Sequence, residues 1–270
     1  YFNKIKDIGK IDHISEWIWG YLKTVIDWAR IESDWLSFDS TIVTRYGDQE
    51  GAKKGYNPNK KGRPSHHPLL AFLNRSRVVL NLWNRSGNTS SANNIIAFFE
   101  RCYERIGPLI KIKGVLADAG FYMESFIEAI ESKGLNYVIT AKLYSTVQRK
   151  IHDVDNWIEI EPGLAISEFN YNHPDWKKDR RYVVVRQSIK RRKKALGKQL
   201  ALFEMDLATQ EYRYGTWVTN MTEDPLTVWR TIRLRSNDEN TIKELKDDLA
   251  LSGFSMTQFY PTEAAMLVRC

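Results

Sequence analysis

Three acidic residues occupy settings in which a carboxylate could bind a metal ion. Asp39 lies within an apolar segment (35–43) that has the composition of a β-strand, and Asp118 ends a second such segment (114–120). Burying a carboxylate without a partner is costly, so each aspartate is expected to cap a turn, pair with an arginine or bind a metal ion. For either residue alone, the sequence favours a structural cap or an ion pair.

The third acid is Glu239, which lies in a region predicted to be helical. Spacings of three and four residues place it on one stripe of that helix, together with Ile232, Arg235, Ile242 and Lys246. This stripe could be an exposed ladder of ion pairs, because Glu239 is four residues from both Arg235 and Lys243. Taken alone, the predicted helix favours the ladder of ion pairs. The three acids taken together suggest instead that Glu239 shares a metal site with the two aspartates.

The predicted elements would bring the three acids to one part of a mixed α/β core. An amphipathic helix is predicted over 12–31, then strands over 35–43, 69–72 and 77–83 in an antiparallel meander, a helix from 95 to 103, and strands over 114–120 and 135–142 separated by a helix over 123–133. A strand, helix and strand joined by short links imply parallel pairing. The order βββαβαβ, with these acids, is the plan of an RNase H-like core.

Strands without helical periodicity follow from 151 to 219 and predict a β-rich insertion. Their segments are 157–161, 164–171, 181–187, 200–207 and 212–220. A long helix is then predicted from Pro225 to 251. We therefore divide the chain into a helical lead-in (1–34), a first part of the core (35–150), the β-rich insertion (151–219) and the end of the core (220–270).

The segments around the acids resemble the DDE transposases of bacterial insertion sequences. The likeness covers FDSTIVTRYGDQEGAKKGYNPNKKGRPSHHPLLAF, RSGNTSSAN, VLADAGFY with YVITAK, and RLRSNDENTIKELK, and so most of residues 35–251. The group's Y-(2)-R-(3)-E-(6)-K signature maps onto Arg235, Glu239 and Lys246, with Ile232 at the position of the tyrosine. The spacing of the acids is similar to that of the branch whose core carries a β-rich insertion.

The resemblance implies a metal-dependent DNA transposase. Asp39, Asp118 and Glu239 would hold two Mg²⁺ ions, for which Mn²⁺ would substitute, and hard carboxylate oxygens suit such ions. Hydrolysis at a transposon end would free a 3′-OH, which would then attack target DNA, so double-stranded DNA is the expected partner. Pairing of two ends implies self-association into a synaptic dimer. A first residue of Tyr also suggests a fragment of a longer transposase.

Positive charge is concentrated in two segments that could contact DNA. The chain has a net charge of +7 and a pI of about 9.2, and residues 177–198 hold eleven basic residues against one acid, while 44–86 hold nine against two. Both segments could instead be solvated loops. The expected DNA-binding residues are Arg235, Lys243, Lys246, Lys60, Lys61, Arg63, Arg85, Arg191 and Arg192.

Two tryptophans of the insertion, Trp157 and Trp176, are candidates for stacking on a base, although burial in a core is the commoner position of a tryptophan. His66 and His67 are predicted to be loop residues without a ligand or base role. No apolar run is long enough to cross a bilayer, no signal peptide is recognisable, and two cysteines are too few for a disulfide framework. A cytoplasmic, nucleoid-associated bacterial protein is expected, with no membrane partner.

Two other functions stay open at this point. One is a catalytically inactive, transposase-derived DNA-binding protein. The other is an RNase H-like nuclease that cuts DNA without joining it.

Overall fold

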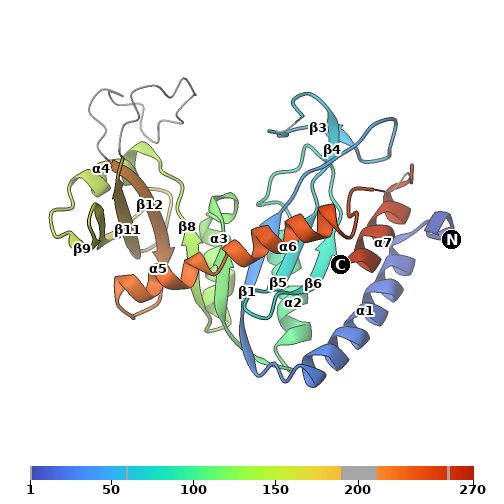
Figure 1. Cartoon of the computed structure of the whole chain (residues 1–270), viewed down its shortest axis with the longest axis horizontal. Helices are drawn as coiled ribbons and strands as arrows, with labels where there is room; N and C mark the ends of the chain where they lie inside the picture. The colour runs from blue at the N-terminus through green and yellow to red at the C-terminus, as the bar shows by residue number, and fades with distance from the viewer. Residues whose placement is uncertain (1, 59, 190–211, 254–255) are drawn as a thin grey trace. The chain divides into compact units, whose positions relative to one another are not determined.

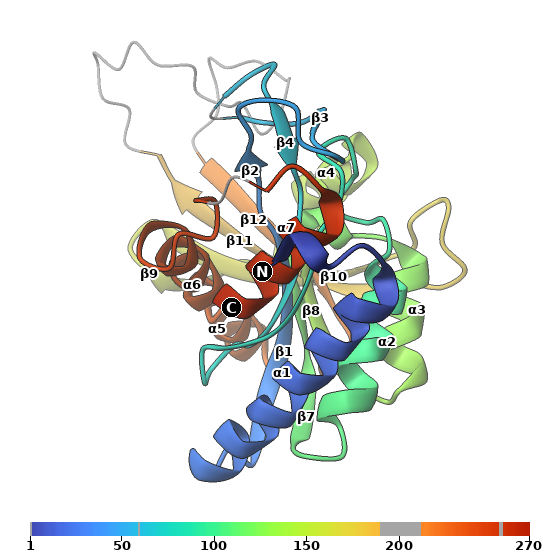
Figure 2. The ribbon, with the colours of Figure 1, turned by 90° about the vertical axis from the view of Figure 1, so that its right-hand side faces the viewer.

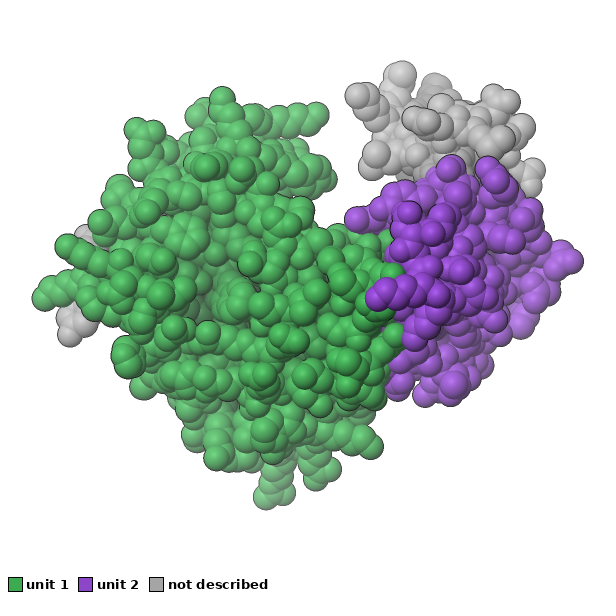
Figure 3. All heavy atoms as spheres, turned by 180° about the vertical axis from the view of Figure 1, so that it is seen from behind, with its two compact units in different colours: residues 1–135, 234–270 green, residues 136–233 purple. Residues whose placement is uncertain are grey.

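The computed structural model describes residues 2–58, 60–189, 212–253 and 256–270. The chain divides into two compact units, one formed by residues 1–135 and 234–270 and the other by residues 136–233 (Figure 3). We call them unit 1 and unit 2 and describe each by itself. Among the described residues, no helix combines the length and the apolar character needed to span a membrane.

Unit 1 contains the sheet that carries Asp39. Its strands are β1 (Ser33–Ser40), β5 (Leu69–Leu73), β6 (Val78–Trp83) and β7 (Lys111–Ala117), in the spatial order β6-β5-β1-β7 (Figure 1). The pairs β1–β5 and β5–β6 are antiparallel, and β1–β7 is parallel. The predicted antiparallel meander is therefore confirmed, as is the mixed α/β class, and the strand order is consistent with an RNase H-like core. The predicted parallel pairing of 114–120 with 135–142 stays a prediction, whereas the observed parallel partner of β7 is β1.

One face of this sheet packs against two helices through aromatic rings. These are α2 (Ile95–Ile106) and α3 (Glu124–Ser132), close to the predicted helices. Phe38 of β1 is fully buried and makes edge-to-face contacts with Phe98 and Phe99 of α2 and Phe126 of α3, at centroid distances of 5.9–6.0 Å. Side chains alternate along a strand, so Ser37 and Asp39 must point to the opposite face.

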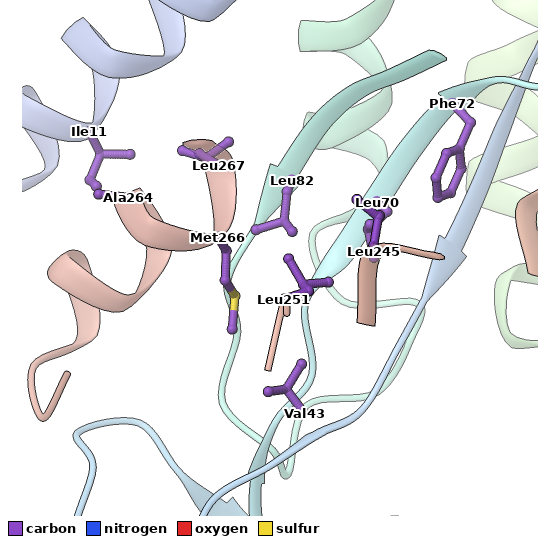
Figure 4. Packing of buried hydrophobic residues seen from close by; sticks show 10 residues of the cluster. All are labelled: Ile11, Val43, Leu70, Phe72, Leu82, Leu245, Leu251, Ala264, Met266 and Leu267. Carbon is purple, nitrogen blue, oxygen red and sulfur yellow. The ribbon is translucent and has the colours of Figure 1, made fainter. Parts of the chain in front are cut away.

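The opposite face packs against α6 (Ser236–Asp247) and α7 (Phe259–Arg269), while α1 (Ile8–Trp28) crosses the edge of the sheet and contributes Ile11 to the same buried cluster (Figure 2). Leu70 and Leu82 of the sheet belong to a buried cluster with Leu245 of α6 and Met266 of α7, shown in Figure 4. Leu70 is the register partner of Asp39 on the neighbouring strand. Because register partners lie on the same face of a sheet, Asp39 lies on the side of α6.

A small second sheet forms from the segment predicted to be a loop. It consists of β2 (Val43–Thr44), β3 (Lys53–Lys54) and β4 (Pro64–His66), in the order β2-β4-β3. The backbone approaches closely at Gly55 and at Gly87, which lies in the turn that packs against this sheet. A Cβ on Gly55 would lie 1.9 Å from the oxygen of Gly87, and one on Gly87 would lie 2.1 Å from the oxygen of Ser65. The glycine-rich segment is thus a packed hairpin with an exposed tip.

The described residues of unit 2 form a five-stranded antiparallel sheet and two helices. Its elements are β8 (Asn136–Thr140), α4 (Ser145–His152), β9 (Ile158–Glu161), β10 (Leu164–Tyr171), β11 (Arg180–Ser188), β12 (Tyr212–Thr219) and α5 (Pro225–Arg233), with the strand order β8-β12-β11-β10-β9. Four predicted strands are observed, whereas the predicted strand over 200–207 lies outside the described residues. Helix α4 was not predicted, and β8 groups with the β-rich strands because it pairs with β12.

The predicted helix from 225 to 251 is two helices. It is interrupted at Leu234 and Arg235, between α5 and α6, and Arg235 takes the N-cap position of α6. The proposed stripe is consequently not continuous: Ile232 belongs to α5, while Glu239 and Lys246 belong to α6. The α7 helix, which follows, was not predicted from the sequence.

The contacts of Phe38 lead to a prediction about stability. The substitution Phe38→Ala should lower the free energy of unfolding by about 3–5 kcal/mol, because it removes a ring that is 0% exposed from between three others. Urea unfolding followed by circular dichroism measures this loss. Trp28→Ala is the control, since Trp28 is 85% exposed, and a change within about 0.5 kcal/mol is expected. Similar effects of the two substitutions would contradict this packing.

Candidate active site

Asp39 and Asp118 lie side by side at the ends of two adjacent parallel strands. The last register pair between β1 and β7 is Phe38 with Ala117, and each aspartate is the next residue of its strand. Oδ1 of Asp39 accepts a hydrogen bond from the backbone N–H of Ser40, at 2.7 Å. Oδ1 of Asp118 accepts one from Gly120, also at 2.7 Å, and so caps the short 3₁₀ helix η2 (Ala119–Phe121). The structure therefore brings together the two aspartates that were predicted to act jointly.

The two carboxylates are close enough to affect each other's ionisation. Burial raises the pKa of Asp39 from 3.8 to about 6, the Arg235 guanidinium opposes this shift, and the negative charge of Asp118 adds to it. Asp39 is only 8% exposed. A buried carboxylate beside a second carboxylate is unfavourable unless positive charge is supplied, and a divalent cation is one way to supply it. The carboxylate oxygens of the acidic pair are therefore suitable ligands for a divalent metal ion.

Two of the predicted cations interact with Asp39, Arg235 by direct contact and Lys246 electrostatically. Nη2 of Arg235 is 2.8 Å from Oδ2 of Asp39, and both side chains are largely buried. Burial lowers the pKa of Lys246, and the charges of Asp247 and, to a smaller extent, Asp39 oppose this shift, so the ammonium of Lys246 is within electrostatic reach of the Asp39 carboxylate. Positive charge from the beginning and the end of α6 is therefore present beside the acidic pair.

A further acid near Asp39, Asp238, was not identified from the sequence. Its Oδ1 accepts hydrogen bonds from Ser37 at 2.9 Å and from Asn74 at 2.8 Å, and it is 1% exposed. Burial raises its pKa to about 7, and the charge of Asp39 contributes to the shift. The available signal was the spacing of Asp238, Thr241 and Leu245, which are three and four residues apart and share the buried face of α6.

Glu239 is not brought into contact with the aspartates. It is exposed in the first turn of α6, and no group of three His, Cys, Asp or Glu side chains suited to a metal ion occurs among the residues that the structure describes. Glu239 lies seven residues before Lys246 and so shares its side of α6. Its role as a metal ligand stays a prediction. Lys243, also on α6, lines a surface pocket with Arg77, Asn240, Glu244, Asp247 and Asp248.

Arg85 has a structural position, which corrects its predicted place on a DNA-binding surface. Its side chain is 6% exposed, and its Nε donates to the carbonyl of His67. Its Nη1 donates to the carbonyls of Ser90, Ser91 and Asn93, at 3.1, 3.2 and 2.7 Å. An arginine enclosed by carbonyl groups in this way fixes the 85–93 turn and is not available to a phosphate.

The remaining predicted DNA contacts are dispersed. Lys60, Lys61 and Arg63 are exposed near the tip of the small sheet, where the guanidinium of Arg63 lies over the ring of Tyr46, 5.6 Å from its centroid. Arg191 and Arg192 lie outside the described residues. Of the three that are described, none is brought to the acidic pair by a contact with another described residue.

Both candidate stacking tryptophans are half-buried in unit 2. The guanidinium of Arg186 lies over the ring of Trp157, 4.3 Å from its centroid, and the indole N–H of Trp157 donates to the carbonyl of Val154. Arg180 lies over Trp176 at 5.4 Å. One face of each indole is therefore covered by an arginine of the same unit.

An acidic pair at the ends of parallel strands, flanked by cations, is suited to chemistry on a phosphodiester. The sequence model for the family described as Transposase DDE domain group 1 matches residues 21–270, and the chain belongs to this family. The match does not test the narrower resemblance to bacterial insertion sequences or to their signature. No curated protein matches the chain significantly.

One solved structure with a similar fold is that of a piggyBac transposase synaptic complex with hairpin DNA, determined by cryo-EM. The identity is 10% and the TM-score is 0.48, and the match covers 87% of this chain and 45% of the other. The present chain thus spans less than half the length of that transposase.

The pKa of Asp39 leads to a prediction about the pH dependence of stability. Because its pKa in the folded protein, about 6, lies above the ordinary 3.8, the folded protein binds this proton more tightly than the unfolded chain does. Asp39 therefore contributes stability below about pH 4 that is lost as the pH rises through about 6. In Asp39→Asn, the decrease in unfolding free energy between pH 5 and pH 8 should be about 1–2 kcal/mol smaller than in the wild type.

Urea unfolding at both pH values, in the presence of a chelator, measures this difference. Asp48→Asn is the matched control, because Asp48 is exposed, and it should retain the pH dependence of the wild type. A wild-type pH dependence in Asp39→Asn would contradict the raised pKa.

Proposed function

We propose that this protein is a DNA transposase that hydrolyses phosphodiester bonds at transposon ends and joins the freed 3′-OH to target DNA. The observation that carries the proposal is the pairing of β1 with β7, which places Asp39 and Asp118 next to each other at the strand ends. Membership of the DDE transposase family supports the same class of reaction. Double-stranded DNA is the proposed substrate, and self-association that pairs two ends is proposed with it.

The acidic pair is the proposed site for divalent cations, with Mg²⁺ as the natural ion and Mn²⁺ as a substitute. Asp39 and Asp118 would hold the ions, and Glu239 is the proposed third ligand. When bound, two such ions supply Lewis-acid chemistry that activates an attacking oxygen and stabilises a leaving one. Carboxylate oxygens are suitable ligands for such ions, and the pKa of Asp39 is raised by burial and, to a smaller extent, by the charge of Asp118.

The two cations of α6 have a proposed role in holding the substrate. Arg235 lies 2.8 Å from Asp39, and Lys246 is within electrostatic reach of it. A guanidinium can contact a phosphate through two N–H groups, whereas an ammonium acts as a point charge. These side chains would orient the phosphates next to the scissile bond.

The proposal predicts separate effects on binding and on cleavage. Asp39→Asn, Asp118→Asn and Glu239→Gln should each bind transposon-end DNA with unchanged affinity and lose strand cleavage to background, because each removes a metal ligand and leaves the DNA surface intact. Binding is measured by electrophoretic mobility shift and cleavage by gel analysis of DNA carrying the element's own ends, with Mg²⁺ or Mn²⁺. The full-length protein is used.

The matched control for Glu239 is Glu244→Gln, since Glu244 is also exposed on α6 but pairs with Arg77. It should retain cleavage. Full cleavage by Asp39→Asn or Asp118→Asn would overturn the proposed site. Full cleavage by Glu239→Gln alone would exclude that residue as a ligand.

A catalytically inactive DNA-binding protein is the second candidate function. The observation that favours it is the absence, among the described residues, of a group of three His, Cys, Asp or Glu side chains that could hold a metal ion. Wild-type protein that binds transposon ends but cleaves none with either metal would support this candidate. Cleavage without joining of a pre-cut end would instead identify a nuclease.

A further inference from the structure

His67, which the sequence assigned to a loop without a role, lies in a buried polar network beside the acidic pair. It is positioned between β4 and β5 and is 8% exposed. Its two ring nitrogens are both engaged, Nδ1 at 2.8 Å from the backbone oxygen of Thr89 and Nε2 at 3.0 Å from Oγ of Ser40. Ser40 Oγ is in turn 2.9 Å from Oγ of Ser91. Four residues from three segments are thereby joined.

The chemistry of the groups fixes the direction of each hydrogen bond. A carbonyl oxygen can only accept, so Nδ1 of His67 carries the proton and donates to Thr89. In the neutral ring Nε2 is then an acceptor, and the hydroxyl of Ser40 donates to it. Because that hydroxyl has a single hydrogen, Ser40 accepts from Ser91. Every donor in this chain of hydrogen bonds has an acceptor.

The ring is neutral at neutral pH. Burial lowers the pKa of His67 below its ordinary value, and the negative charge of Asp118 opposes this shift. The imidazole is therefore close enough to the acidic pair to experience its charge. As a neutral group, it does not contribute a further cation there.

The network links the backbone segments that carry the two aspartates. Ser40 directly follows Asp39 at the end of β1. On the other side, Ser91 packs against Gly120, where an added Cβ would lie 2.8 Å from Cβ of Ser91 and 2.9 Å from Oδ1 of Asp118. Arg85 fixes the same turn through the carbonyls of His67 and Ser91. A displacement of His67 would therefore alter both strand ends.

We propose that His67 is a positioning residue of the active site, which sets the separation of Asp39 and Asp118 by holding Ser40 and, through it, Ser91. This inference rests on the proposed metal-binding function of the acidic pair. His67 acts through Ser40 and does not itself contact the metal or the DNA. Its removal should weaken metal binding even where the protein remains folded.

The test measures the affinity of the metal-free protein for Mn²⁺ by isothermal titration calorimetry. In His67→Asn the amide nitrogen can still donate to Thr89, but the acceptor for Ser40 is lost, and affinity should fall about 10–100-fold. The longer side chain of His67→Gln can present an oxygen near the position of Nε2, and should recover part of the affinity. Ser40→Ala, which removes only a hydroxyl, should resemble His67→Asn.

The neighbouring His66 provides a matched control. It is also buried, but its ring contacts Nε of Arg45 and the carbonyl of Glu50, and neither contact leads to an aspartate of the site. His66→Asn should lower the stability to urea and leave the Mn²⁺ affinity unchanged. If His67 served only stability, His67→Asn would likewise lower the stability to urea and leave the Mn²⁺ affinity unchanged.

The outcomes separate the two proposals. Unchanged Mn²⁺ affinity in folded His67→Asn and Ser40→Ala, combined with its loss in Asp39→Asn, would overturn the role of His67 and retain the metal site. Mn²⁺ binding that is absent from the wild type or insensitive to Asp39→Asn would overturn the proposed metal site itself, and the role of His67 with it.

Discussion

The parallel pairing of β1 with β7 is the constraint on which the rest of unit 1 depends. It fixes Asp39 next to Asp118, and two neighbouring carboxylates, one of them buried, raise the free energy of the folded state. The surroundings offset part of this cost through the backbone N–H groups of Ser40 and Gly120 and the guanidinium of Arg235. The buried aromatic contacts of Phe38, on the other face of β1, contribute the packing that keeps the strand in this register.

Local patterns were sufficient to predict the strands of unit 1 and the position of two acids on them. Alternating, β-branched and apolar residues identified β1, β5, β6 and β7, whereas the pairing of β1 with β7 was not predicted from the sequence. They could not identify Asp238, whose partner Ser37 is 201 residues away in the sequence. The division between α5 and α6 was missed because the 225–251 segment has continuous helical spacing. Arg235, at the N-cap of α6, pairs with Asp39, which is too distant in the sequence for local spacing to indicate.

Several arginines of the two basic segments are buried or paired with acids, so the number of basic residues in a segment does not measure its exposed positive charge. Of the basic residues between 44 and 86, Arg45 and Arg85 are buried with internal partners, and Arg77 pairs with Glu244. In the second basic segment, Arg180 is buried and Arg181 pairs with Glu168. These cations stabilise the fold, whereas the exposed ones of 44–86 lie largely on the small sheet. Net charge over a segment therefore overstates the positive surface available to DNA.

A single guanidinium serves two buried acids at the start of α6. Arg235 contacts Asp39 at 2.8 Å, while its Nε lies 3.9 Å from Oδ2 of Asp238, an oxygen that has no hydrogen-bond partner among the described residues. Burial raises the pKa values of Asp39 and Asp238 to about 6 and 7, and the single guanidinium of Arg235 offsets these shifts only in part. The helix start is thus anchored to β1 by groups whose charge remains incompletely balanced. Negative charge that the ion pair leaves uncompensated would attract a further cation, which would compete with the Arg235 guanidinium for Oδ2 of Asp39.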